Sequence, residues 1–325
     1  MLLIVSIIAV IIASTGTPDD SVYCLSLSFE DGVGPGCNGH SEYNDNLPKD
    51  AAGYTTKFDE MVDIVKLAPG EKILMGLSGG GGAALYTGMT ATNTDGTALF
   101  SKQLLVAPYL DVAIIGPALG PIEAMGLGEV KVDFGASCRG RRGLGKRGKP
   151  ASSSSSTQHS ALTTSPLTTG YCNYKFNRIG AMRQVAQDAL ANLAILPSTS
   201  IEVVLVQGDG TVTNKDIVEL ADRLDTLAAG DSTKESSRCM LGHVDARHSP
   251  LSIWNYMHQV GDEELEWVPE LVCQFTDFLV AGTAMPTAGT IEDGDPPASL
   301  PQCATACPGA CSYSCANDTY LTCGA

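Results

Sequence analysis

Three residues whose types suit nucleophilic chemistry stand far apart in the sequence. Ser78 is the central residue of G-L-S-G-G, which fits the pattern G-x-S-x-G. Asp209 follows a β-branched run in the order G-D-G-T, and His248 stands further on in R-H-S-P. A serine hydroxyl becomes a nucleophile when an imidazole takes its proton and a carboxylate orients that imidazole. The set therefore predicts acyl transfer through a covalent serine intermediate.

Two members of this set have competitors. His243 stands shortly before His248, and we prefer His248 because it directly precedes Ser-Pro and the entry toward the last expected helix. Asp216 or Asp245 can substitute for Asp209 as the acid. The other histidines, at positions 40, 159 and 258, are expected to be surface or structural residues.

The segment around Ser78 predicts a strand, a tight turn and a helix. Lys72 to Met75 is a short apolar run typical of a buried strand, and Ala83 to Thr87 tolerates a helix that Gly88 can end. Glycines beside the serine let the strand and the helix approach it closely. The N–H of Gly79, at the expected helix N-terminus, is the expected oxyanion donor.

The same glycines allow two other interpretations. Gly79 to Ala84 fits the dinucleotide-binding pattern G-x-G-x-x-A, which needs an acidic residue at the end of the next strand. The nearest candidate, Asp95, lies in T-N-T-D-G-T, which is turn chemistry. No lysine follows the glycines as a phosphate-binding P-loop requires. A flexible glycine loop is the third interpretation.

Apolar periodicity elsewhere predicts an α/β fold. Expected strands span 22–29, 104–107 and 201–206, and expected helices span 56–67, 179–196, 216–227 and 267–280. Helices that alternate with strands in this way favour a mostly parallel sheet flanked by helices.

The serine motif, the G-D-x-x-V turn at Asp209 and the histidine loop, in the order Ser, Asp, His, resemble an α/β-hydrolase fold serine hydrolase of the esterase/lipase type. The resemblance covers Val22 to Gly282. It implies that Ser78 is the nucleophile, that His248 acts as general base and then acid, and that Asp209 holds the imidazole. It implies an ester or lipid-like small molecule as substrate, with no metal and no cofactor.

The chain departs from this family at its N-terminus. Only 77 residues precede Ser78, whereas the family has further strands there and one of their loops gives the second oxyanion donor. The chain therefore resembles an N-terminally truncated member. Asp31 to Gly34 can supply the missing donor, or the donor is absent. The alternative to an enzyme is a catalytically inactive hydrolase-fold binding or cell-surface module, and a nucleotide-binding protein ranks third.

Composition suggests secretion and a division into segments. Residues 1–16 are expected to be a signal peptide or a buried strand, residues 17–282 the hydrolase domain, and residues 283–325 a cysteine-rich tail. A basic and serine-rich stretch at 139–169 predicts a disordered insertion. Eleven cysteines and an N-glycosylation sequon at Asn317 favour an extracellular, oxidising environment. Bridges are expected between Cys138 and Cys172 and between Cys239 and Cys273.

The net charge of −16 argues against nucleic acid or an anionic membrane as the main partner. The apolar run from Leu2 to Ala13 is too short for stable membrane insertion. The sequence leaves the oligomeric state and the exact substrate open.

Overall fold

The structure is a computed structural model, and the residues that it describes lie mainly in the centre of the chain. They are 8–13, 22–26, 47–111, 127–133, 173–209, 211–241, 275, 278–279, 287–291, 300–303, 311–312 and 322–323. All five histidines, Cys138, Cys172, Cys273, Asp245, Asp31 to Gly34 and the insertion at 139–169 lie outside these residues.

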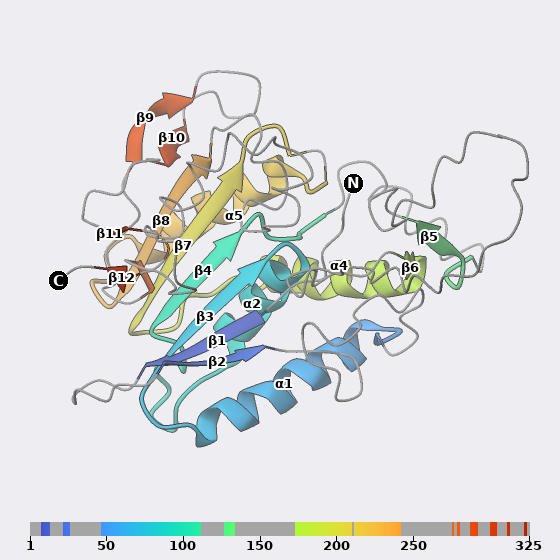
Figure 1. The fold of residues 1–325 in the computed structure, drawn as a ribbon, viewed down its shortest axis with the longest axis horizontal. Coiled ribbons are helices and arrows are strands. Elements are labelled where there is room, and N and C mark those ends of the chain that lie inside the picture. The colour runs from blue at the N-terminus through green and yellow to red at the C-terminus, as the bar shows by residue number, and fades with distance from the viewer. Residues whose placement is uncertain are drawn as a thin grey trace, which may run out of the picture.

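An eight-stranded sheet forms the centre of the molecule (Figure 1). Its strand order is β2-β1-β3-β4-β7-β8-β10-β9. The four central strands, β3 (Glu71–Leu77), β4 (Lys102–Val106), β7 (Thr199–Val206) and β8 (Lys234–Leu241), run parallel. The parallel centre has an antiparallel pair on one side, β1 (Ile8–Ala13) and β2 (Val22–Ser26). On the other side, β10 (Leu300–Cys303) runs parallel to β8, and β9 (Thr287–Ile291) antiparallel to β10.

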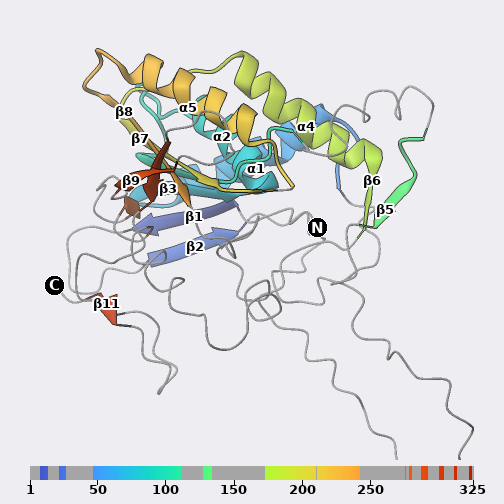
Figure 2. The ribbon, with the colours of Figure 1, turned by 90° about the horizontal axis from the view of Figure 1, so that it is seen from above.

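Four described helices lie on one face of the sheet, as Figure 2 shows. They are α1 (Ala51–Leu67), α2 (Gly79–Thr90), α4 (Phe176–Ala191) and α5 (Asn214–Ala228). Helix α5 buries an apolar stripe at helical spacing, with Ile217, Leu220 and Leu224 fully covered. Strand β7 is buried along Ile201–Val206, as expected for a central strand of a mostly parallel sheet. Among the described helices, none has the length and apolar content that a membrane span requires.

Two small antiparallel pairs lie outside the main sheet: β5 (Lys131–Asp133) with β6 (Asn173–Lys175), and β11 (Cys311–Ser312) with β12 (Thr322–Cys323). The first pair precedes α4 directly.

The predicted mostly parallel sheet flanked by helices is confirmed, with shifted boundaries. Helix α1 begins at Ala51 rather than at residue 56 because the Asp50 side chain caps it, accepting a hydrogen bond from the N–H of Gly53 at 2.8 Å. Helix α4 ends at Ala191, so the predicted extension to residue 196 is wrong. Leu193 and Ile195 continue the apolar pattern beyond the helix because the connection to β7, in which they lie, is itself buried.

The N-terminal segment and the tail both contribute strands to the sheet. Ile8–Ala13, within the expected signal peptide, forms β1 between β2 and β3. In the tail, Cys303 forms a disulfide with Cys239. The predicted pairing of Cys239 with Cys273 is therefore wrong. Strand β10 lies beside β8, with Gln302 opposite Met240, and this brings the Cα atoms of the two cysteines to 4.9 Å.

Candidate active site

Ser78 occupies a strained turn between β3 and α2. Its backbone has φ 56° and ψ −121°, and the residue is fully buried. A positive φ is uncommon for a residue with a Cβ, and such strain persists only where the surrounding structure imposes it. The sharp strand-to-helix turn predicted from G-x-S-x-G is therefore present.

The glycines of this segment are needed because other backbone lies where their side chains would be. A Cβ on Gly76 would lie 2.2 Å from the carbonyl oxygen of Gly80. A Cβ on Gly81 would lie 2.7 Å from the Cα of Pro108, and one on Gly82 would lie 2.5 Å from the carbonyl oxygen of Tyr109. Contacts this short require a shift of backbone, so the turn tolerates only glycine at these positions without rearrangement.

Hydrogen bonds from both neighbouring elements hold the Ser78 backbone. Its N–H donates to the carbonyl of Val106 at 2.9 Å. Its carbonyl accepts from the N–H groups of Gly81 at 2.8 Å, Gly82 at 3.2 Å and Tyr109 at 2.7 Å. The turn is thus fixed by the helix that follows it and by the end of β4.

Gly79, the expected oxyanion donor, is the first residue of α2 and is buried. The first N–H groups of a helix have no partner within it, and they carry the positive end of the helix dipole. Gly81 and Gly82 already donate to the Ser78 carbonyl. The N–H groups of Gly79 and Gly80 therefore remain as the donors of this helix start that can meet an anionic oxygen.

Asp209 lies at the same edge of the sheet as Ser78. The two residues follow the carboxyl ends of β3 and β7, which are separated by β4. Adjacent strands lie about 4.8 Å apart, so roughly 10 Å separates the two strand ends. One carboxylate oxygen of Asp209, Oδ1, accepts from the N–H groups of Thr211 at 2.7 Å and Val212 at 3.3 Å. The turn therefore fixes this carboxylate, which is half-buried.

The residues expected to complete the site fall outside the described part of the chain. This applies to His248, to its competitor His243 and to the alternative acid Asp245. Asp216, the other alternative acid, lies in the first turn of α5. Burial raises its pKa, and the negative charges of Asp111 and Glu219 raise it further. Among the described residues, Ser78, Gly79 and Asp209 thus lie at the same edge of the sheet.

The segment that follows β4, Ala107–Asp111, also contacts the serine turn, and the sequence does not predict this role. We call this segment the clamp. Ala107 is buried with φ 41°, and its N–H donates to the carbonyl of Val204 at 2.8 Å. Tyr109 bonds the Ser78 carbonyl through its N–H, and its hydroxyl donates to the carbonyl of Ile179 in α4 at 3.3 Å. The only sequence signal was Pro108, which marks the end of a strand.

Two side chains of helix α4 bind the C-terminal end of the clamp. The side-chain amide of Gln187 donates to the Leu110 carbonyl at 2.8 Å. Arg183 forms a bidentate ion pair with Asp111, Nε to Oδ1 at 2.7 Å and Nη2 to Oδ2 at 2.9 Å. The hydrogen bonds to Asp111 raise the pKa of Arg183. A continuous set of contacts therefore joins α4 to the serine turn.

The dinucleotide interpretation of the glycines lacks its acidic residue. Asp95 lies in a turn, where its Oδ1 accepts from the N–H of Thr97 at 3.0 Å and from the Thr97 hydroxyl at 2.6 Å. These bonds lower its pKa. The prediction that Asp95 is a turn residue rather than a strand end is confirmed.

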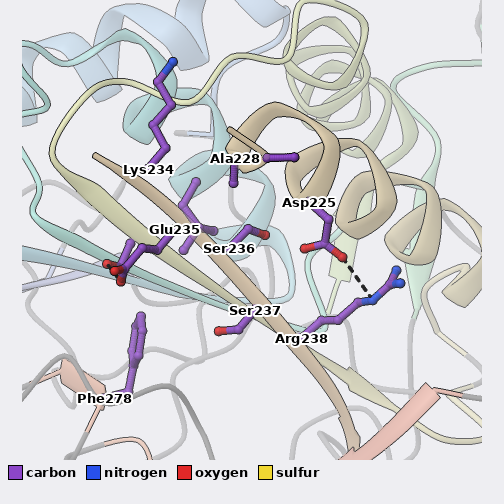
Figure 3. Close-up of a pocket in the computed structure, with 11 residues that line it drawn as sticks. Asp225, Ala228, Lys234, Glu235, Ser236, Ser237, Arg238 and Phe278 are labelled. Carbon is purple, nitrogen blue, oxygen red and sulfur yellow. Dashed lines mark hydrogen bonds and ion pairs between the residues drawn. The ribbon is translucent and has the colours of Figure 1, made fainter. Parts of the chain in front are cut away.

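A pocket of about 680 Å³ lies at the other end of the strands from Ser78 (Figure 3). Ser200 at the start of β7 and Lys234 at the start of β8 line it, together with Phe278. The ion pair between Arg238 and Asp225, 3.5 Å from Nε to Oδ2, closes one side. Ligands of parallel α/β sheets bind at the carboxyl ends of the strands, so this pocket is not the candidate active site. No cluster of three or more potential metal ligands occurs among the described residues.

No protein-family model and no curated protein matches the chain. Three solved structures are similar to it. A soluble variant of monoglyceride lipase from Saccharomyces cerevisiae has 15% identity and a TM-score of 0.38, over 60% of this chain and 62% of that chain. A monoacylglycerol lipase of Paleococcus ferrophilus has 11% identity and a TM-score of 0.45, over 72% and 76%. A metagenome-derived lipolytic enzyme has 12% identity and a TM-score of 0.39, over 64% and 71%.

The chain therefore spans less than two thirds of the first of these structures. All three TM-scores are below 0.5. The described chain itself shows a mostly parallel sheet flanked by helices, with a serine at a strained strand-to-helix turn over the carboxyl edge of the sheet.

Proposed function

We propose that this protein is a serine hydrolase that cleaves a carboxylic ester or a similar acyl compound. The observation that carries the proposal is the positive φ of Ser78 at the N-terminus of α2. Backbone strain of this kind clusters at active sites, and a serine there projects its hydroxyl beside the N–H groups of the helix start. Asp209 is held at the same edge of the sheet, where its carboxylate can pair with the charge of a histidine.

The proposed reaction has two halves. The Ser78 hydroxyl oxygen attacks the acyl carbon while His248 takes the hydroxyl proton, and Asp209 stabilises the resulting imidazolium. The Gly79 N–H donates to the oxyanion. The tetrahedral intermediate collapses, His248 returns the proton to the leaving alcohol, and an acyl-enzyme remains. Water, deprotonated by His248, then attacks the acyl-enzyme and releases the acid and Ser78.

A fluorophosphonate probe tests the nucleophile. We expect it to label the wild-type protein and not Ser78→Ala. Ser200→Ala is the matched control, because Ser200 lies at the start of β7, where its hydroxyl donates to Glu235 away from the serine turn. Equal labelling of Ser78→Ala and wild type would refute the assignment.

Hydrolysis of 4-nitrophenyl butyrate distinguishes an enzyme from an inactive hydrolase-fold module. We expect turnover that is lost in Ser78→Ala and in His248→Ala but kept in His243→Ala. Loss in His243→Ala alone would make His243 the base. Folded wild-type protein that neither reacts with the probe nor turns over the ester would refute the hydrolase and support the binding-module alternative.

We also propose that the protein acts outside the cell. The buried disulfide between Cys239 and Cys303 supports this, because such bonds persist in oxidising compartments. Expression with the native N-terminus should give protein in the medium, and retention in the cytosol with reduced cysteines would contradict the proposal.

A further inference from the structure

Arg178 is a buried cation whose charge is poorly compensated. It is among the largest fully buried side chains of the described residues, with 1% of its surface exposed. Within the described part of the chain, neither its Nε nor its Nη1 makes a hydrogen bond. The carboxylate that forms an ion pair with it among the described residues is Glu129, whose Oε1 lies 4.0 Å from Nη1, beyond hydrogen-bond distance. Burying a charged group without hydrogen bonds is costly, so the position favours an additional acceptor.

Glu129 is already engaged by other donors. Its Oε2 lies 2.7 Å from the Lys175 ammonium, and its Oε1 accepts from the side-chain amide of Asn177 at 2.8 Å. These two hydrogen bonds lower the pKa of Glu129 to about 2. Glu129 thus pairs closely with Lys175 and lies further from Arg178, so it leaves the buried guanidinium without a hydrogen-bonded carboxylate among the described residues.

The cluster of Glu129, Lys175 and Arg178 lies at the N-terminus of α4, a 16-residue helix, where the helix dipole adds positive potential. The turn before β5 is fixed against this helix start. The N–H of Phe176 donates to the Val130 carbonyl at 3.2 Å, and the N–H of Asn177 donates to the Gly128 carbonyl at 2.9 Å. Backbone bonds therefore hold Glu129 and the helix start together.

The clamp connects this cluster to the serine turn. The Tyr109 N–H bonds the Ser78 carbonyl, and the Tyr109 hydroxyl bonds the carbonyl of Ile179, the residue after Arg178. Tyr109 therefore joins the serine turn to the first turn of α4, which contains Arg178.

We propose that Arg178, together with Lys175, binds a carboxylate carried by the substrate, so that the preferred esters are hemiesters of dicarboxylic acids. The inference rests on the proposed function and adds the substrate class to it. The substrate carboxylate supplies Arg178 with the acceptor that it lacks. Glu129 competes with that carboxylate for Lys175.

Two esters with the same number of acyl carbons test the proposal: 4-nitrophenyl hemisuccinate, which carries a carboxylate, and 4-nitrophenyl butyrate, which does not. The measured quantity is the ratio of their kcat/KM values. We expect Arg178→Gln to lower this ratio about tenfold or more, the range for a charge-assisted hydrogen bond, with butyrate hydrolysis kept. Glu129→Gln, which removes the competitor, should raise the ratio.

Lys175→Gln provides a second variant if Arg178→Gln does not fold, because the Lys175 side chain is not fully buried. Lys57→Gln is the matched control, since Lys57 pairs with Glu60 on the exposed surface of α1. It should leave the ratio unchanged. A ratio equal to that of wild type in both Arg178→Gln and Lys175→Gln would overturn the proposal.

A binding measurement separates this inference from the hydrolase proposal. Succinate, at constant ionic strength, should raise the Tm of the wild type and not that of Arg178→Gln. If succinate does so while neither ester is hydrolysed, the anion site stands and the hydrolase proposal fails. If both esters are hydrolysed but succinate raises the Tm of the wild type and the Tm of Arg178→Gln equally, the hydrolase proposal stands and the anion site fails. An equal shift from inorganic phosphate would assign the site to anions in general, which would contradict a carboxylate site.

Discussion

At the scale of single residues, the serine turn depends on the absence of side chains around it. In Gly76→Ala, the new Cβ would lie 2.2 Å from the Gly80 carbonyl oxygen and 2.8 Å from the Ala84 Cβ, so the first turn of α2 must move. We expect a loss of about 1–3 kcal/mol in the free energy of unfolding, as for other overpacked sites. We also expect slower fluorophosphonate labelling of Ser78. Urea unfolding and the labelling rate measure the two effects.

Gly96→Ala is the matched control for this substitution. Gly96 has φ +84° but no atom within 4 Å of an added Cβ, so the change costs only the backbone strain of about 1–2 kcal/mol. Labelling should proceed at the wild-type rate. If Gly76→Ala also labels at that rate, crowding of the turn does not govern the nucleophile.

The sequence predicts the serine turn because every requirement for it is local: a strand, a serine, glycines and a helix within a short segment. Asp209 is predictable for a similar reason, since it directly follows a β-branched strand. Tyr109 is not predictable, because its bond to the Ser78 carbonyl depends on the register between β3 and β4. Nothing near Tyr109 in the sequence reports that register.

At the scale of secondary-structure elements, the ion pair between Arg183 and Asp111 ties α4 to the clamp. We expect Arg183→Gln to lower the free energy of unfolding by about 1–2 kcal/mol, a value reduced for the partial exposure of both side chains. Burial and the charge of Asp111 already raise the pKa of Asp216, so Asp216 favours folding when protonated. Without the Arg183 cation this pKa rises further. The loss should therefore be larger at pH 7 than at pH 4, by urea unfolding.

A double-mutant cycle with Asp111→Asn provides the control. When Asp111 is already neutral, removing Arg183 should cost less, because the attraction between the two charges is already lost. Equal costs of Arg183→Gln in both backgrounds would show that the pair does not stabilise this junction. A cost that is larger at pH 4 than at pH 7 would contradict the role assigned to Asp216.

Periodicity predicts the helices where one face alone is apolar, as in α5, whose buried stripe repeats at helical spacing. It overextends α4, because Leu193 and Ile195 are buried in an irregular connection and periodicity cannot distinguish that from a helix. The pairing of β10 with β8 escapes prediction for another reason. It joins strands that are far apart in the sequence. Leu300–Cys303 is also short and contains few apolar residues, so its sequence does not predict a strand.

At the scale of the whole molecule, the disulfide between Cys239 and Cys303 joins the C-terminal strands to the central sheet across 64 residues of sequence. A crosslink over a loop of this length restricts the unfolded chain, which corresponds to about 4 kcal/mol of stabilisation in the chain-entropy model. We expect Cys303→Ser to lower the free energy of unfolding by this order, and Cys273→Ser to leave the bridge intact. Non-reducing peptide mapping identifies the bridge, and urea unfolding measures its contribution.

The same variants separate the stability of the molecule from the chemistry of the site. Cys239 lies in β8, and two strands, β4 and β7, lie between β8 and β3, which leads into the serine turn. Cys303→Ser should therefore be labelled by the fluorophosphonate at the wild-type rate at temperatures where it is folded. A bridge to Cys273 in the peptide map would instead place the tail elsewhere, and β10 would then lose the covalent link that holds it beside β8.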